Sequence, residues 1–160
     1  EILINDVYTK KFTDEKKDEI RRKNISIIFQ DNNLLSDFTA IENVMMPLII
    51  KGEKSEKAEK EAEKILKVVK IFDRAQHFPN ELSGGEQQRI AIARALIAET
   101  NLILADEPTG NLDSVNSESM IDLLFEYTKK SHTSLVMVTH DNSIAKRCDR
   151  IIEIRDGQIV

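Results

Sequence analysis

The sequence has little of several features that would assign it to common functional classes. Only one of its 160 residues is a cysteine, Cys148, which excludes a disulfide framework and a cysteine-rich metal site. No apolar run reaches the ~20 residues that a membrane-spanning helix needs, and no signal peptide is visible. The formal net charge is −5 and no dense basic run occurs, so nucleic acid is not expected as the main partner.

Glycine is also scarce, and a common phosphate-binding loop is absent. That loop, GxxxxGK[ST], cradles phosphates with backbone amides and neutralises them with its lysine. The sequence has five glycines, and none of them is followed by lysine: Gly52, Gly84, Gly85, Gly110 and Gly157. The 160 residues therefore contain no loop of this kind.

What the sequence does contain is concentrated in residues 82–113, which read LSGGEQQRIAIARALIAETNLILADEPTGNLD. Ser83-Gly84-Gly85 opens a predicted helix, where glycines let another molecule approach the backbone closely. The unbonded N–H groups of the first helical turn form an anion site. Further along, Ile90, Ala93 and Ile97 recur at helical spacing, which predicts a buried stripe.

A short apolar run, Leu102 to Ala105, follows this helix and predicts a buried parallel strand. It ends in two adjacent carboxylates, Asp106 and Glu107. Carboxylates at the end of a buried strand are costly unless a cation meets them. In open α/β sheets, ligands bind at this end of the strands.

Two other β-rich runs end in polar side chains. Residues 25–29 predict a buried strand followed by Gln30, and residues 134–139 predict a second buried strand followed by His140. A histidine there can hold a phosphate oxygen or steady an attacking water. Both residues could also be incidental, Gln30 as a solvated loop residue and His140 beside a helix cap.

The remaining elements alternate in the same way, which predicts an α/β fold with a mainly parallel sheet. Thr13 is a predicted N-cap, and Thr39 with Glu42 forms a predicted capping box. The expected further elements are a strand in 1–5, helices in 14–23, from 39, in 56–70, 114–130 and 141–147, a strand in 151–154, and a hairpin turn at Asp156-Gly157.

In this order, the motifs resemble the nucleotide-binding domain of ABC ATPases. LSGGE resembles the signature loop, LSGGQ in the family, with Glu86 in the last place; LILADE resembles the Walker B strand, and NLD the D-loop. The resemblance implies a P-loop NTPase-like α/β fold with a small α-helical subdomain, lacking the P-loop strand and helix. The ATPase core would comprise 1–30 and about 99–160, and the subdomain about 31–98.

The same resemblance implies ATP and Mg²⁺ as ligands and a role for each matched residue. Asp106 would hold magnesium through water, with Gln30 near metal and water, and Glu107 would be the general base. His140 would contact the γ-phosphate. The partner's ATP would lie against Ser83, Gly84, Gly85 and Glu86, and Asp113 would lie at the dimer seam.

The implied partners are a second ATPase domain, paired head to tail, and transmembrane permease subunits. The permease would contact the region Gln30–Ile50, at the cytoplasmic face of the inner membrane. For Leu34, Leu35 and Phe38, permease docking and subdomain packing both remain open. FQDNNLLSDFTAIENVMMPL with ADEPTGNLD is similar to the lipoprotein-releasing, macrolide-export and FtsE-type subfamily, most of all to its lipoprotein-releasing members.

Two other classes of function stay open beside the transporter ATPase. One is a non-transport ABC protein that acts on DNA or ribosomes, and the other is a protein that lends only its signature loop to a partner. The missing phosphate loop leads us to expect a fragment of a longer ATPase. We expect that these residues alone neither bind nor hydrolyse ATP appreciably, and that the strand near 135–139 has a bare apolar edge.

Overall fold

The computed structural model of the chain describes residues 3–4, 7–110 and 114–160. Its helices are α1 (Asp14–Asn24), α2 (Ala40–Ile50), α3 (Ser55–Val68), α4 (Gly84–Ile97), α5 (Ser114–Ser131) and α6 (Asn142–Ala145). Its strands are β1 (Leu3–Ile4), β2 (Val7–Tyr8), β3 (Ile25–Ile28), β4 (Leu102–Asp106), β5 (Ser134–Val138), β6 (Ile154–Arg155) and β7 (Gln158–Ile159). Short 3₁₀ turns occupy Thr9–Lys11, Phe72–Arg74 and Pro79–Glu81.

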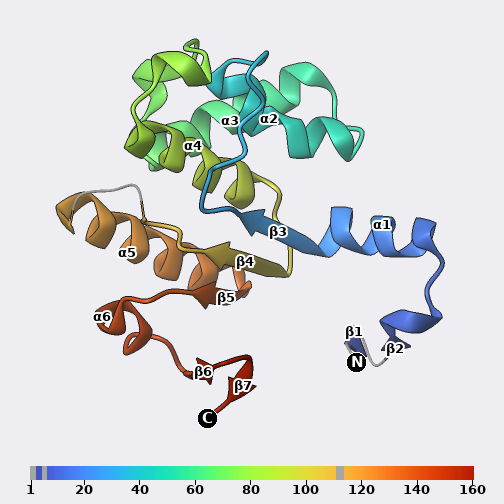
Figure 1. Ribbon diagram of the computed structural model, residues 1–160. Helices are drawn as coiled ribbons and strands as arrows, with labels where there is room; N and C mark the ends of the chain where they lie inside the picture. Colours follow the sequence, from blue (N-terminus) through green and yellow to red (C-terminus); the bar gives the residue numbers. More distant parts are fainter. Residues whose placement is uncertain (1–2, 5–6, 111–113) are drawn as a thin grey trace.

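A parallel sheet of three strands in the order β3-β4-β5 lies at the centre of the molecule (Figure 1). Ile28 lies opposite Ala105, and Asp106 lies opposite Val138. The three strands therefore end at nearly the same level, with their carboxyl ends along one edge. The predicted α/β class and the parallel sheet are confirmed.

Helices α4 and α5 cover one face of this sheet and form the core with it. Ile28, Ile103 and Ala105 point to this face and are buried with Ile92 of α4 and Leu124 of α5. Burial of a large aliphatic side chain contributes about 1.5–3 kcal/mol, so this layer fixes the positions of the strand ends. The predicted stripe of α4, Ile90, Ala93 and Ile97, is buried as expected.

The opposite face of the sheet is open among the described residues, which corrects the prediction that β3 and β5 are fully buried. Ile27, Val136 and Val138 point to this face and are 40%, 54% and 60% exposed. Apolar runs predict burial on both faces only when layers flank the sheet on both sides. Within the described chain, β5 also pairs with β4 alone, so the expected bare edge is present.

A layer of three helices, α2, α3 and α4, packs beside the sheet (Figure 1). α2 begins at the predicted capping box: the Thr39 hydroxyl accepts from the Glu42 N–H, and the Thr39 N–H donates to the Glu42 carboxylate. α4 contacts both α2 and β3, so it joins the helical layer to the sheet. No helix among the described residues has the length and hydropathy to cross a membrane.

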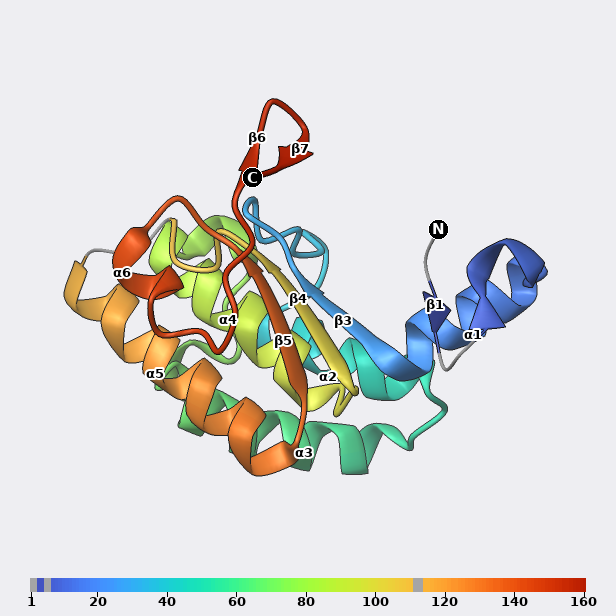
Figure 2. The same cartoon turned by 90° about the horizontal axis from the view of Figure 1, so that it is seen from below.

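The two ends of the described chain form small antiparallel hairpins, β1-β2 and β6-β7, which lie away from the central sheet (Figure 2). The predicted strand in 1–5 is described only at Leu3–Ile4. The strand predicted in 151–154 is wrong for residues 151–153, because they find no partner strand among the described residues. The predicted turn is confirmed, since Asp156 and Gly157 both have positive φ, as a type I′ hairpin turn requires.

Candidate functional site

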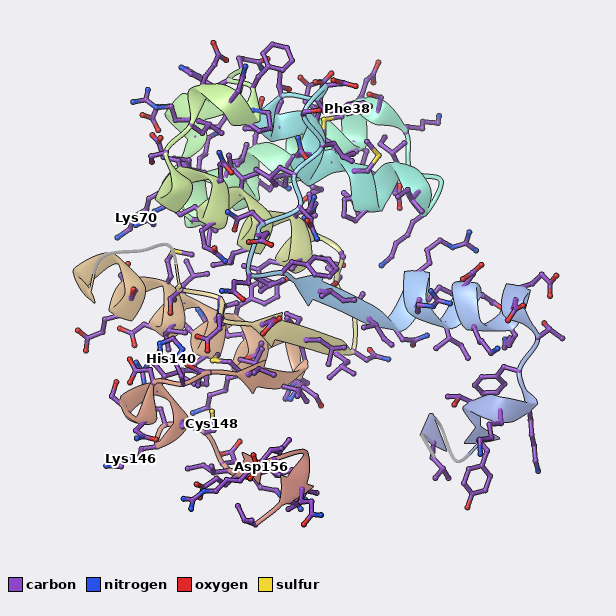
Figure 3. All side chains as sticks on the ribbon, viewed as in Figure 1. Phe38, Lys70, His140, Lys146, Cys148 and Asp156 are labelled. Carbon is purple, nitrogen blue, oxygen red and sulfur yellow. The ribbon has the colours of Figure 1, made fainter. Side chains whose placement is uncertain are left out.

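Four predicted site residues follow the carboxyl ends of the three parallel strands. Asp106 ends β4 and Glu107 follows it, Gln30 lies two residues beyond β3, and His140 lies two residues beyond β5. Figure 3 shows His140 where the chain leaves β5 and enters α6. The parallel register brings these strand ends to one edge of the sheet, where ligands of α/β proteins bind.

The backbone at Glu107 turns this side chain toward His140. Glu107 has a φ of 45°, in the left-handed region that non-glycine residues rarely adopt. Its N–H donates to the Val138 carbonyl at 3.0 Å, and its own carbonyl accepts from Gly110 at 3.0 Å. The strand thus ends in a turn that is bonded to β5, and Glu107 is held through both its backbone N–H and its backbone carbonyl.

The Glu107 carboxylate is held from three directions. Its Oε1 accepts the His140 backbone N–H at 2.9 Å and lies 2.7 Å from His140 Nδ1, and its Oε2 accepts from the Thr139 hydroxyl at 3.5 Å. The Glu107 side chain is only 18% exposed, whereas the His140 ring is 86% exposed. A carboxylate fixed beside an accessible imidazole can accept a proton from water and share it with the ring.

The segment after His140 is bonded to α5, and this limits the positions that His140 can take. The Asp141 carboxylate caps α6 by accepting from the Ser143 hydroxyl and from the Ser143 N–H, both at 2.7 Å, and these two bonds lower the pKa of Asp141. Arg147 donates to Asp122 of α5 and lies over the Phe125 ring, 5.0 Å from its centroid. Strand β5, α6 and α5 together therefore set the position of His140.

Asp106 has the chemistry that a magnesium ion requires. It is exposed at the end of β4, and carboxylate oxygens are the preferred protein ligands of Mg²⁺. The described residues contain no cluster of three or more metal-binding side chains. One carboxylate fits Mg²⁺ all the same, because this ion is usually held by one or two carboxylates together with phosphates and water.

Gln30 lies in a tight turn that follows β3. The Asn32 N–H donates to the Phe29 carbonyl at 3.1 Å and closes a turn with Gln30 at its second position. Gln30 itself is exposed. Its side-chain amide carries both a donor and acceptors, so it can serve a metal ion or a water at this edge of the sheet.

The signature residues form the N-terminus of α4. Ser83 is the N-cap, and its hydroxyl accepts from the Glu86 N–H at 3.3 Å while its N–H donates to Glu86 Oε2 at 2.8 Å. Gly84 and Gly85 occupy the first helical positions, whose N–H groups have no acceptor within a helix. Among the described residues, no hydrogen bond links this loop to Glu107 or His140, so the structure does not join the two parts of the predicted site.

Glu86, the last residue of the signature loop, is held as a carboxylate by its neighbours. The Ser83 N–H, then the Ser83 hydroxyl and the Arg74 guanidinium, hold the pKa of Glu86 below its usual value. Arg74 Nε lies 3.0 Å from Glu86 Oε1. The negative charge at the helix N-terminus is thus partly offset by an arginine from the preceding loop.

Sequence reasoning missed three residues that shape these sites: Thr139, Arg74 and Arg94, which binds the loop after Gln30. The spacing Ser83-x-x-Glu86 is itself a capping-box signal, so the role of Glu86 could have been found. No local sequence pattern indicates the roles of Thr139, Arg74 and Arg94. Asp113, predicted at the dimer seam, lies outside the described residues.

Comparisons with known proteins agree with these motifs. The profile of the family described as "ABC transporter" matches residues 1–110. The lipoprotein-releasing system ATP-binding protein LolD of Legionella pneumophila is 42% identical over 158 residues, which cover 99% of this chain and 70% of that protein.

Solved structures similar to this chain are also ABC transporter proteins. Two structures of the ATP-binding cassette MJ0796 superpose with a TM-score of 0.91 at 41% identity, over 98% of this chain and 69% of theirs. One is titled a dimeric post-hydrolysis state bound to ADP and Pi, the other a dimeric bacterial ABC transporter cassette. The chain therefore belongs to the ATP-binding ATPase subunits of ABC transporters.

Proposed function

We propose that this chain belongs to the subunit that hydrolyses ATP to drive the release of lipoproteins from a membrane. The support for this substrate is the 42% identity, across nearly the whole chain, with a protein of the lipoprotein-releasing system. The observation that carries the hydrolytic role is the Glu107 carboxylate, fixed by His140 beside the exposed Asp106.

Each residue at the sheet edge has a part in this proposal. Glu107 accepts the proton of the attacking water, and the His140 backbone N–H and ring keep its carboxylate aimed. Asp106 would hold Mg²⁺ through water, and Gln30 would contribute its amide oxygen to the metal or the water. The magnesium ion neutralises phosphate charge when it is bound.

The signature loop serves a second copy of the ATPase. The N–H groups of Gly84 and Gly85 and the Ser83 hydroxyl face the phosphates bound by the partner, since helix N-termini attract anions. Asp113 lies at the same seam in this arrangement. The dimeric state named for MJ0796 supports pairing with a second ATPase domain, for which the proposed arrangement is head to tail.

The helical layer is the proposed route to the membrane subunits. Residues 31–98 form a subdomain beside a core of 1–30 and 99–160, and the region Gln30–Ile50 meets the permease at the cytoplasmic face of the inner membrane. Leu35 and Phe38 are exposed there at 43% and 38%. Exposed large apolar side chains on a connecting segment suit a protein contact.

The test of the hydrolytic role is Glu107→Gln in the protein as its source produces it. The amide keeps the shape of the side chain but removes the base, so we expect ATP binding to persist and turnover to fall by at least about a hundredfold. Steady-state ATPase rates and equilibrium binding measure the two effects. Glu126→Gln, on the exposed side of α5, is the matched control; equal turnover in both variants would remove Glu107 from its role.

The test of the transported substrate uses the source organism. Depletion of the native protein should leave lipoproteins in the inner membrane that normally leave it, as fractionation and immunoblotting would show. Normal lipoprotein distribution after depletion, together with an ATPase that still depends on Glu107, would retain the transporter ATPase and exclude this substrate.

A further inference from the structure

A half-buried arginine from the middle of α4 holds the loop that carries Gln30. Arg94 Nη2 donates to the Asn32 carbonyl at 2.6 Å, and Arg94 Nη1 donates to the Asn33 carbonyl at 2.7 Å. Burial lowers the pKa of the half-buried Arg94 guanidinium. The planar guanidinium suits two adjacent acceptors, because its donors form a rigid fork.

The backbone of this loop is shaped to present the two carbonyls together. Asn32 and Asn33 have φ values of 61° and 46°, and asparagine is among the few residues that enter this region readily. The Asn32 N–H closes the turn on Phe29 that contains Gln30. Arg94 therefore binds the same residue whose N–H sets the conformation at Gln30.

The next part of the connection is held separately. Asn43 of α2 is fully buried, and its amide oxygen accepts from the Leu35 N–H at 2.8 Å. The two hydrogens of its amide nitrogen are shared among the carbonyls of Leu35, Phe38 and Thr39, each 3.0 Å from the nitrogen. The connection from β3 to α2 thus has two anchors. Arg94 fixes the part next to Gln30, and Asn43 fixes the part next to α2.

We infer that Arg94 is a positioning residue for catalysis, which ties the Gln30 turn to the helix that carries the signature loop. The inference rests on the proposed role of Gln30 in ATP hydrolysis. Arg94 lies ten residues along α4 from Gly84, which corresponds to ~15 Å of helix. When the signature loop shifts against the nucleotide bound by the partner, α4 therefore transmits the shift as a rigid helix. The shift reaches the Gln30 turn, which belongs to the site of the same chain.

The experiment is a double-variant cycle on the native protein with Gln30→Ala and Arg94→Met. Methionine keeps the unbranched bulk and removes every donor. We expect each single variant to lower kcat about tenfold or more, because small misplacements of a site group have large effects, with the KM for ATP changed less than about twofold. The double variant should be no slower than Gln30→Ala alone, since Arg94 acts through Gln30. Arg94→Lys should restore part of kcat by bonding one carbonyl.

Arg89→Met is the matched control on the same helix. Arg89 donates to the Val69 carbonyl at 3.1 Å. The kcat of Arg89→Met therefore shows the effect of losing an arginine of α4 that binds a carbonyl away from the Gln30 turn. Equal losses of kcat in Arg94→Met and Arg89→Met, or additive losses in the double variant, would overturn the positioning role and leave the proposed function standing. Unchanged kcat in Gln30→Ala would overturn both the positioning role of Arg94 and the proposed role of Gln30, and would leave ATP hydrolysis through Glu107 standing.

Discussion

At the residue scale, Glu86 makes the start of α4 sensitive to pH. Its folded pKa is held below its usual value of 4.5, chiefly by the Ser83 N–H. A lowered pKa means that the ionised form stabilises the fold above about pH 4.5, and that this contribution is lost as pH falls through the folded pKa. The signature loop should therefore loosen in mild acid.

We expect Glu86→Gln to weaken this dependence. Glutamine still completes the capping box but does not titrate, so the free energy of unfolding of the variant should fall less between pH 5 and pH 3 than that of the parent. Urea unfolding across this range measures the difference, and NMR titration of the Glu86 carboxyl gives its pKa directly. Parallel pH curves for the two proteins would contradict the assignment.

The chemistry of single residues was the part of the site that the sequence revealed best. Asp106, Glu107, Gln30 and His140 each follow an apolar run and were assigned to the site by the resemblance to ABC ATPases, and the structure puts all four at one edge of the sheet. The contact of His140 with Glu107 could not be predicted, because it depends on the positive φ of Glu107. Arg94 was missed for a related reason: its acceptors lie 61 and 62 residues away in the chain.

At the scale of elements, the start of α2 depends on one hydroxyl. Thr39 accepts from the Glu42 N–H at 3.5 Å and donates to the Glu42 carboxylate at 2.8 Å. We expect Thr39→Ala to lower the free energy of unfolding by about 1 kcal/mol, the usual value of an N-cap, and Thr39→Ser to change it by only a few tenths. Urea unfolding of the native protein measures both. An equal loss in the two variants would show that the methyl group, not the cap, stabilises the helix.

Helices were predicted more closely than strands. The first residues of α1, α2 and α4 are set by N-caps, namely Thr13, Thr39 and Ser83. Each cap bonds a residue within four positions of itself in the sequence. Burial of a strand depends on what lies on each face, and this is a property of distant segments. That is why Ile27 and Val136 were expected to be buried and are exposed in the described chain.

At the scale of the whole molecule, the lack of a hydrogen bond between the signature loop and Glu107 or His140, among the described residues, bears on assembly. The N-terminus of α4 attracts anions, yet the signature loop makes no hydrogen bond to the chain's own site among the described residues. This arrangement fits a site that a second copy of the chain completes. In a two-fold symmetric dimer each contact occurs twice. Loss of one group from the loop should therefore weaken pairing at two places.

We expect Ser83→Ala to reduce ATP-driven dimerisation of the native protein, measured by analytical ultracentrifugation in a Glu107→Gln background that retains ATP. A hydrogen bond to a charged group contributes about 1.5–3 kcal/mol, so the dimer should dissociate at least about tenfold more readily. Ser83→Ala also removes a helix cap, and Thr39→Ala controls for this, because it removes the same capping box from α2. If both variants dimerise like their parent, the Ser83 hydroxyl does not meet the partner's nucleotide; if both lose dimerisation equally, the effect comes from helix stability.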